Sequence, residues 1–130
     1  MKKYLRQQRV IEDDLDELNH VNNIRYIEWV MSIAKEHWQK EANEAIFNRY
    51  FWVLTDHHIQ YKKPAFLNDQ LSLETYVVKS SGAISERVVE IYHSDSKQLL
   101  AVSKTTWCLI DNQSKKPSRM TDEMAQLFVK

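Results

Sequence analysis

The sequence predicts an α+β domain in which a mainly antiparallel β-sheet is wrapped around one long central α-helix. A long helical pattern over residues 22–41 stands between one short strand pattern before it and a series of strand patterns after it. The later strand patterns follow one another through short turns, as the strands of antiparallel hairpins do. A parallel sheet needs a helix between successive strands, so this order excludes repeated βαβ units.

The predicted helix has one broad apolar face. Its apolar and aromatic positions recur at intervals of three and four residues, the spacing of one side of an α-helix. These positions are Tyr26, Ile27, Val30, Ile33, Ala34, His37 and Trp38. Trp29 and Met31 widen the face, and the pattern becomes polar from Gln39 onward. We therefore expect the first turns of the helix to be buried against the sheet.

The remaining elements follow from alternating apolar residues and from turn residues. Tyr4–Ile11 predicts a short first strand, and the acidic residues 12–14 predict the turn after it. Four longer strands are predicted at Phe51–Tyr61, Leu71–Val78, Ile84–His93 and Leu99–Ile110. Thr121 is a typical helix cap, so Thr121–Val129 predicts a short closing helix.

Length, composition and charge indicate one globular domain without nucleic acid or membrane partners. The 130 residues are 43% hydrophobic and 28% charged, which is unlike a disordered chain, and we assign residues 1–130 to a single domain. Eighteen basic and eighteen acidic residues cancel, so no overall field attracts nucleic acid or an anionic membrane. No apolar run has signal-peptide length, and we expect a cytoplasmic protein.

A motif at the start of the predicted helix points to a protein family. Residues 14–29 read DLDELNHVNNIRYIEW, which fits the pattern DxDxxxHVNNxxYxxW. This pattern, between a first strand and a long apolar helix, resembles the signature of hot-dog-fold thioesterases. Residues 61–69 read YKKPAFLND, which is similar to the family's Y-x-x-P-A-x-x-G-D segment. The resemblance implies a hot-dog fold and the hydrolysis of acyl thioesters.

Two groups of thioesterases share the DLD and HVNN strings with this chain. They are the acyl-CoA thioesterases related to 4-hydroxybenzoyl-CoA thioesterase and the acyl-carrier-protein thioesterases. The resemblance implies an acyl-CoA or acyl-carrier-protein thioester as substrate, no cofactor, and assembly into a homodimer or homotetramer. The carrier and the acyl group stay open at this point.

The resemblance assigns catalysis to Asp16, the second aspartate of the D-x-D string. Asn23 lies at a position that carries histidine or asparagine in relatives, and we expect it to be the second catalytic residue. The candidate substrate-binding residues are His20, Asn22, Ile24, Tyr26 and Tyr61. Taken alone, an aspartate just before a helix is commonly a cap that accepts backbone hydrogen bonds.

These residue types suit thioester hydrolysis. A leaving thiol with a pKa of about 8.5 departs as thiolate without a strong general acid, so one carboxylate is enough. Asp16 is expected either to attack the carbonyl carbon or to act as general base on water, and the sequence leaves both routes open. The helix that starts near Asn22 or Asn23 offers unpaired N–H groups and a positive dipole end to the oxyanion.

Two positions depart from the family pattern. Glycine is common in the family where this chain has Asn19 and Asn68. Asparagine reaches left-handed backbone conformation more readily than most non-glycine residues. We therefore predict left-handed backbone at both positions.

Other polar residues have less specific interpretations. His57 and His58 are adjacent in a strand and point to opposite faces, so we expect no metal site there. Candidate contacts for the phosphates of coenzyme A are Lys62, Lys63, Lys79, Arg87 and Lys104, with solvated strand positions as the alternative.

Two rival functions stay open from the sequence. A hot-dog hydratase or dehydratase needs a histidine paired with an acid, and His20 and Asp16 are the obvious pair. A non-catalytic acyl-thioester binding module would use the same pocket without bringing Asp16 to the carbonyl.

Overall fold

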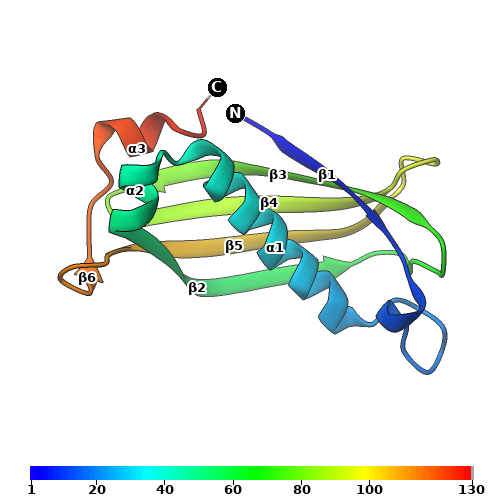
Figure 1. Cartoon of the computed structure of the whole chain (residues 1–130). Coiled ribbons are helices and arrows are strands. Elements are labelled where there is room, and N and C mark those ends of the chain that lie inside the picture. The colour runs from blue at the N-terminus through cyan, green and yellow to red at the C-terminus, as the bar shows by residue number, and fades with distance from the viewer. Residues whose placement is uncertain (130) are drawn as a thin grey trace.

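The structure is a curled antiparallel sheet with α1 lying across its inner face (Figure 1). This computed structural model describes residues 1–129. The long elements are β1 (Tyr4–Arg9), α1 (Asn23–Glu41), β2 (Tyr50–Tyr61), β3 (Gln70–Ser81), β4 (Ile84–His93) and β5 (Leu99–Asp111). The short ones are the 3-10 helix η1 (Glu12–Asp14), α2 (Glu44–Arg49), β6 (Lys116–Pro117) and α3 (Asp122–Gln126). The strand order is β1-β3-β4-β5-β2, with β6 beside β5 and every pair antiparallel, as predicted.

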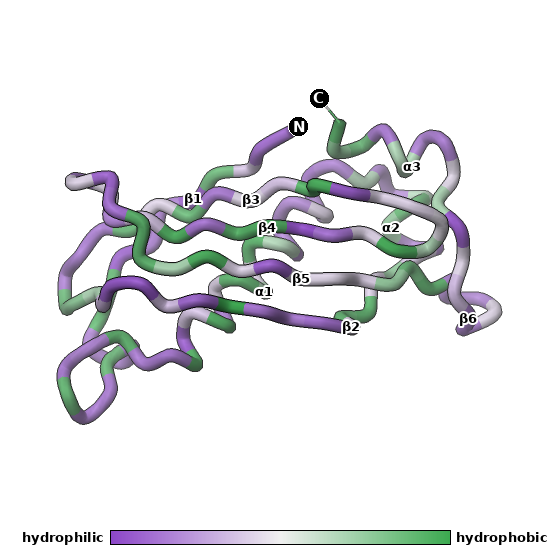
Figure 2. Tube along the Cα trace, turned by 180° about the vertical axis from the view of Figure 1, so that it is seen from behind, coloured by the Kyte–Doolittle hydropathy of each residue, from purple (hydrophilic) through white to green (hydrophobic). Residues whose placement is uncertain are grey.

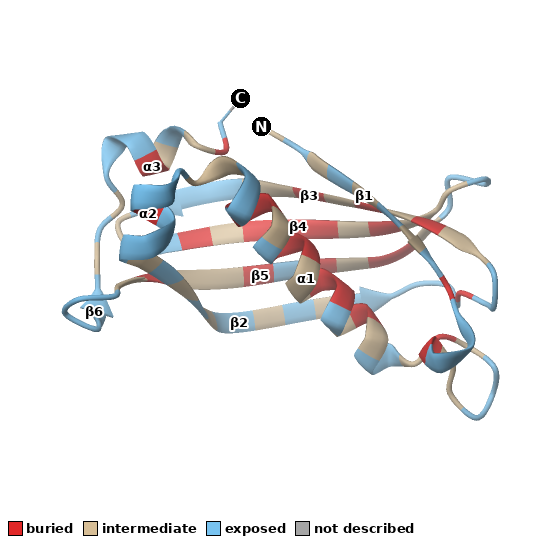
Figure 3. Cartoon of the chain, in the orientation of Figure 1, coloured by how far each residue is buried: buried red, intermediate tan, exposed pale blue. Residues whose placement is uncertain are grey.

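Helix α1 begins where the sequence predicts it. Asn22 is the cap, and its side chain accepts a hydrogen bond from the Ile24 amide at 3.0 Å. The buried face appears as the red stripe along α1 in Figure 3, and consists of Tyr26, Trp29, Val30, Ile33, Ala34, His37 and Trp38. Packing of this face, more than helix propensity, stabilises α1. Among the helices of residues 1–129, none has the length and apolar content to cross a membrane.

Helix α2 and strand β6 are absent from the sequence prediction. α2 has six residues, fewer than two turns, so no apolar period can be recognised in it. Its start is marked by a cap, because the Asn43 side chain accepts from the Ile46 amide at 2.8 Å. The predicted elements are present with shifted ends, since β3 runs to Ser81 and α3 ends at Gln126.

The core consists of two apolar clusters and a layer of buried polar side chains. The larger cluster contains Tyr26, Val30 and Ile33 of α1 together with sheet residues such as Leu73 and Ile91. The smaller cluster contains Trp38, Ile46, Leu109, Met124 and Phe128. The buried polar side chains on α1 and the sheet are His37, Thr75, Ser85, Arg87, Ser103 and Thr105.

Arg87 and His37 lie at the centre of the polar layer. The Arg87 residue is 6% exposed, so the solvated or phosphate-binding position expected from the sequence is wrong. Its Nη1 donates to Nδ1 of His37 at 2.9 Å and to Oγ1 of Thr75 at 3.0 Å. Strand alternation explains the burial, because Arg87 shares the inward face of β4 with Val89 and Ile91.

Burial shifts the pKa of both groups. Desolvation, together with the Arg87 cation, lowers the pKa of His37 from 6.5 to about 4. Desolvation lowers the pKa of Arg87 to about 10, which leaves the guanidinium protonated at neutral pH. His37 is therefore neutral, accepts at Nδ1 and carries its proton on Nε2, which lies 4.0 Å from Glu41.

The sheet ends in two edges of unequal length. β1 is an edge of six residues, whereas β2 is an edge of twelve residues that pairs with β5 along one side. Figure 2 shows β2 bordering the sheet when the molecule is seen from behind. β2 contains Asp56 but no lysine or proline, the residues that commonly protect a free edge.

We predict that the fold weakens in mild acid because of His37. The unfolded chain takes up a proton at His37 near pH 6.5 and the folded chain near pH 4, so between these values the unfolded state binds more protons. The free energy of unfolding should fall by about 2 kcal/mol from pH 7 to pH 5 through this residue. Urea titrations at both pH values measure the change. In His37→Asn this part of the pH dependence should vanish, and an equally large fall in that variant would contradict the assignment.

Candidate active site

Asp16 lies in a tight loop between η1 and α1. A β-bridge between Leu15 and Val21 closes the loop, and the Asp16 amide donates to the His20 carbonyl at 2.7 Å. The Asn19 amide turns back to the Asp16 carbonyl at 3.1 Å, and Asn19 has a φ of 63°. The left-handed backbone predicted at Asn19 is confirmed, and it completes the turn that carries Asp16.

One oxygen of the Asp16 carboxylate holds this loop together. Oδ1 accepts hydrogen bonds from the amides of Leu18 at 2.9 Å and His20 at 3.1 Å. This is the loop-forming role that an aspartate in such a turn commonly has. Because both bonds use Oδ1, the second oxygen, Oδ2, has no hydrogen-bond partner among residues 1–129.

The first turn of α1 supplies a backbone donor. Asn22 accepts hydrogen bonds from two amides of this turn. Its side-chain Oδ1 accepts from the Ile24 amide, and its main-chain carbonyl accepts from the Arg25 amide at 2.8 Å. The Asn23 amide has no acceptor among residues 1–129 and is free to donate to a ligand. The positive end of the helix dipole strengthens this donor.

Asp16 and Asn23 line one cleft of about 320 Å³. The other lining residues are His20, Val21, Tyr26, Tyr61, Lys62, Lys63 and Pro64. Most of the predicted site residues therefore come together from three separate parts of the chain. Asn22 and Ile24 do not line the cleft, because the Asn22 side chain caps the helix and the Ile24 side chain is exposed to solvent.

Tyr26 and Tyr61 form one wall of the cleft and fix the helix start. Their rings meet edge to face with centroids 5.5 Å apart. The Tyr61 hydroxyl donates to the Asn23 carbonyl at 3.3 Å, and the Tyr26 hydroxyl accepts from the Ala65 amide at 3.2 Å. Burial raises the pKa of both tyrosines, so their hydroxyls stay protonated and act as hydrogen-bonding groups.

The segment from residue 61 to residue 69 is hydrogen-bonded to the main chain on both sides of the Asp16 loop. The Val21 amide donates to the Ala65 carbonyl at 3.0 Å, and the Asn68 amide donates to the Val10 carbonyl at 3.0 Å. Asn68 has a φ of 70°, so the left-handed backbone predicted there is confirmed. The two sequence motifs thus meet in space and build one site.

An ion pair between a buried carboxylate and a partly exposed guanidinium connects η1 to α1. Asp14 is 5% exposed, and its Oδ1 lies 3.0 Å from Nε of Arg25. The other carboxylate oxygen accepts from the Ile11 amide at 2.9 Å. Arg25 makes a second ion pair at 3.5 Å with the exposed side chain of Glu28. The pair with Asp14 fixes the loop that carries Asp16 relative to the first turn of α1.

The histidines have separate positions. The main chain of His20 makes the contacts with Asp16, while its ring packs edge-on against Phe66 with centroids 5.3 Å apart. His57 is half-buried and lies 2.8 Å from Oγ of Ser103, whereas His58 is exposed, so these two point to opposite faces as predicted.

The basic residues that the sequence offered as phosphate contacts fall into three groups. Lys62 and Lys63 line the cleft. Lys79 and Lys104 lie at exposed strand positions. Arg87 lies in the core, and the signal for this in the sequence was its place in the inward period of β4. The cleft thus has two cations beside the Asp16 loop.

Comparison with protein families adds an independent observation. The family model described as the thioesterase-like superfamily matches residues 10–128. The chain belongs to the thioesterase-like superfamily. The match includes the whole D-x-D string from Asp14 to Asp16, α1 and every strand from β2 to β6. The thioesterase family to which the motifs pointed is therefore confirmed. No curated protein matches the chain.

Solved structures, among them a thioesterase and a probable thioesterase, share the fold of this superfamily member. YbaW, a probable thioesterase from Escherichia coli, has a TM-score of 0.84 at 24% identity, over 97% of this chain and 98% of that chain. Slr0204 from Synechocystis, a 1,4-dihydroxy-2-naphthoyl-CoA thioesterase, has a TM-score of 0.82 at 18% identity, over 96% and 94%. The SAV2348 protein from Staphylococcus aureus, in complex with CoA, has a TM-score of 0.84 at 13% identity, over 98% and 83%. These similarities confirm the predicted hot-dog fold.

We predict that the ion pair between Asp14 and Arg25 stabilises the site. Arg25→Met leaves the buried Asp14 carboxylate without its cation, and the free energy of unfolding in urea should fall by about 1–2 kcal/mol. Glu28→Gln is the matched control, because it removes the exposed partner of the same arginine and should change stability by less than about 0.5 kcal/mol. Equal losses of unfolding free energy in the two variants would show that the pair with Asp14 contributes no more to stability than the exposed pair with Glu28.

Proposed function

We propose that this protein is an acyl-CoA thioesterase that hydrolyses acyl thioesters to the free acid and the free thiol. The observation that carries the proposal is that Asp16 and Asn23 line one cleft, while Oδ2 of Asp16 and the amide of Asn23 have no hydrogen-bond partner among residues 1–129. Acyl transfer needs a nucleophile or base at the carbonyl carbon and a donor at the carbonyl oxygen. Membership in the thioesterase-like superfamily supports the same reaction class.

In the proposed reaction the thioester carbonyl lies between Asp16 and the start of α1. Asp16 either attacks the carbon to form a mixed anhydride that water hydrolyses, or takes a proton from the attacking water. The Asn23 amide and the helix dipole stabilise the developing oxyanion, and one such donor is worth about 3 kcal/mol in other enzymes. The thiolate leaves unprotonated because the pKa of a thiol is about 8.5.

Lys62 and Lys63 support coenzyme A as the carrier. Both line the same cleft as Asp16, and their ammonium groups suit the phosphates of coenzyme A. SAV2348, which shares the fold, was solved in complex with CoA. An acyl-carrier protein presents its acyl group on a phosphate-bearing arm as well, so its thioesters are the second candidate substrate.

The position of His20 favours hydrolysis over hydration or dehydration. Proton transfer at the α and β carbons of an acyl thioester needs an imidazole beside an acid. Here the His20 ring packs on Phe66 and the main chain of His20 contacts Asp16. A binding module without activity is the remaining alternative, and release of free thiol decides between it and the enzyme.

We predict that Asp16→Asn abolishes turnover and leaves the fold intact. Asparagine keeps an oxygen that accepts from the Leu18 and His20 amides, but it supplies neither a nucleophile nor a base. The rate of thiol release from a panel of acyl-CoA substrates, measured with a thiol reagent, should fall by at least about a hundredfold. Melting temperature and circular dichroism should stay close to those of the wild type.

The matched control is Glu17→Gln, which removes an exposed acid from the same loop and should leave turnover unchanged. Asn23→Ala should reduce turnover in part, since the backbone donor remains. Full activity in Asp16→Asn would refute the catalytic assignment. Complete loss in a folded His20→Ala variant would favour the dehydratase instead.

We also propose that two copies pair through β2 to form a homodimer. The outer side of this twelve-residue edge has backbone groups without a strand partner, and one acidic residue is its single charge besides histidines. A second copy of β2, running antiparallel, would satisfy these groups under twofold symmetry. A homotetramer would need a further interface between such dimers.

We predict a mass of at least twice 15.5 kDa by light scattering. Val53→Lys places a charge at an exposed position of β2 and should shift the mass toward that of one chain. Val78→Lys changes an exposed valine of β3, which is not an edge strand, and should leave the mass unchanged. A wild-type mass of one chain at micromolar concentration would contradict the dimer.

A further inference from the structure

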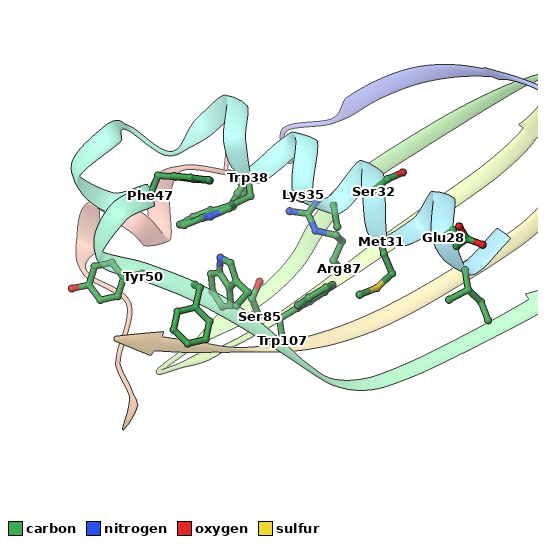
Figure 4. Close-up of a pocket in the computed structure, with 15 residues that line it drawn as sticks. Glu28, Met31, Ser32, Lys35, Trp38, Phe47, Tyr50, Ser85, Arg87 and Trp107 are labelled. Carbon is green, nitrogen blue, oxygen red and sulfur yellow. The ribbon is translucent and has the colours of Figure 1, made fainter. Parts of the chain in front are cut away.

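A second and larger cavity, of about 750 Å³, lies beside the C-terminal half of α1 (Figure 4). Its walls come from α1, α2, the start of β2, and the inward faces of β4 and β5. Aromatic side chains make up almost half of the lining residues, and they are Trp38, Phe47, Tyr50, Phe51, Trp52, Trp107 and Phe128. A cavity of this size and composition is typical of a small-molecule site.

Arg87 is the buried charge of this cavity. Figure 4 shows its side chain reaching from β4 toward α1, with Trp38 and Met31 on either side. Within residues 1–129, no ion pair includes Arg87, and both hydrogen bonds of the guanidinium use Nη1. Nη2 and Nε are therefore left for a ligand. Its protein partners are neutral His37, Thr75 and the ring of Phe128, whose centroid lies 5.2 Å from Cζ, and none of them carries a negative charge.

The other charged residues of the cavity are arranged along α1. Lys35 is exposed at the rim, near Arg87 in Figure 4. Glu28 lies two turns earlier, toward the catalytic end of the helix, and is paired with Arg25 at 3.5 Å. An anion in the cavity would thus meet cations at the end remote from Asp16.

The two cavities lie along the same elements. Asn23 and Tyr61 line the catalytic cleft, while Met31 and Phe51 line the larger cavity, so both are bordered by α1 and by β2. Arg87 donates to His37, which lies fourteen positions after Asn23 on α1, so the helix start and Arg87 are separated by about 21 Å along the helix axis. One extended molecule can span that distance.

We propose that the larger cavity binds the acyl group of the substrate and that Arg87 binds a carboxylate at the end of that acyl group remote from the thioester. The inference rests on the proposed thioesterase function and names its substrate class, the ω-carboxyacyl thioesters. An aliphatic or aromatic chain fits the apolar walls. A terminal carboxylate accepts from Nη2 and Nε of Arg87 in the two-bond geometry that guanidinium groups favour.

The physical reason is the cost of a buried cation without a carboxylate. Taking a guanidinium out of water is unfavourable unless an anion compensates it, and a methyl-terminated chain would remove the last water from Arg87 without compensation. A carboxylate supplies both the opposite charge and the acceptors. The cavity should therefore select for the carboxylate rather than merely tolerate it.

The test compares two CoA thioesters of equal chain length, one ending in a methyl group and one in a carboxylate. For the wild type, kcat/KM should be about ten- to a hundredfold higher with the carboxylate-ended substrate, the range expected for one charge-assisted contact. In Arg87→Met the ratio of the two kcat/KM values should fall to about one or below. Arg87→Lys, which keeps the charge, should retain part of the preference.

Binding is measured separately with the two corresponding CoA thioethers, which cannot be hydrolysed. Calorimetry should give tighter binding of the carboxylate-ended thioether to the wild type, and equal binding of the two to Arg87→Met. Lys104→Met removes an exposed cation from the neighbouring strand and should change neither ratio. Circular dichroism of each variant verifies that it is folded.

The outcomes separate this inference from the proposed function. No thiol release from either thioester, together with an Arg87-dependent difference in thioether binding, would refute the enzyme and support the subsite. Equal kcat/KM values and equal binding for the two chain ends in the wild type would overturn the inference. A change of oligomeric state in folded Arg87→Met would also overturn the inference. It would indicate that a second copy of the chain, and not an acyl group, covers the cavity.

Discussion

The first turn of α1 has to be held at a fixed distance from the loop that carries Asp16, and the ion pair between the buried Asp14 carboxylate and Arg25 does this. Asp14 is anchored to the chain after β1 through the Ile11 amide, while Arg25 is part of the helix itself. Loss of the pair would leave a charge in a site with little access to water. The free amide of Asn23 therefore keeps its place beside Asp16 because of residues that do not touch a substrate.

Within the loop, the Asp16 side chain has both a structural role and a proposed chemical role. Oδ1 of Asp16 closes the turn, and that turn is possible because Asn19 adopts a left-handed conformation. A catalytic group whose orientation is fixed by main-chain hydrogen bonds needs little reorganisation before reaction. The loop-forming role of Asp16 and its proposed catalytic role are therefore compatible, since the loop uses Oδ1 and the proposed chemistry would use Oδ2.

The polar layer around Arg87 shows the opposite arrangement. Its side chains hold no loop in place and cap no helix, and burial keeps His37 neutral, so that it accepts a hydrogen bond from Arg87. Apolar residues at these positions would give a core of equal or greater stability, because buried ions rarely improve stability over well-packed apolar side chains. A buried guanidinium at the wall of a large apolar cavity is best understood through what the cavity binds. In the proposed acyl site, the aromatic walls would contact the chain of the acyl group and the guanidinium would bind its carboxylate.

The sequence by itself determined the class of fold, the helix start, the left-handed asparagines and the identity of the motif residues. These features depend on local periodicity, on caps and on backbone preference, which are written in neighbouring residues. It did not predict α2, which is too short to show a period, and it left open which of Asn22 and Asn23 caps the helix, a role that the structure gives to Asn22. Only the tertiary structure decided that Tyr61 meets Asn23 and that Arg87 is buried beside His37, since these contacts join residues 38 and 50 positions apart. Such pairings follow from the strand register and the packing of α1 on the sheet, which no single stretch of sequence contains.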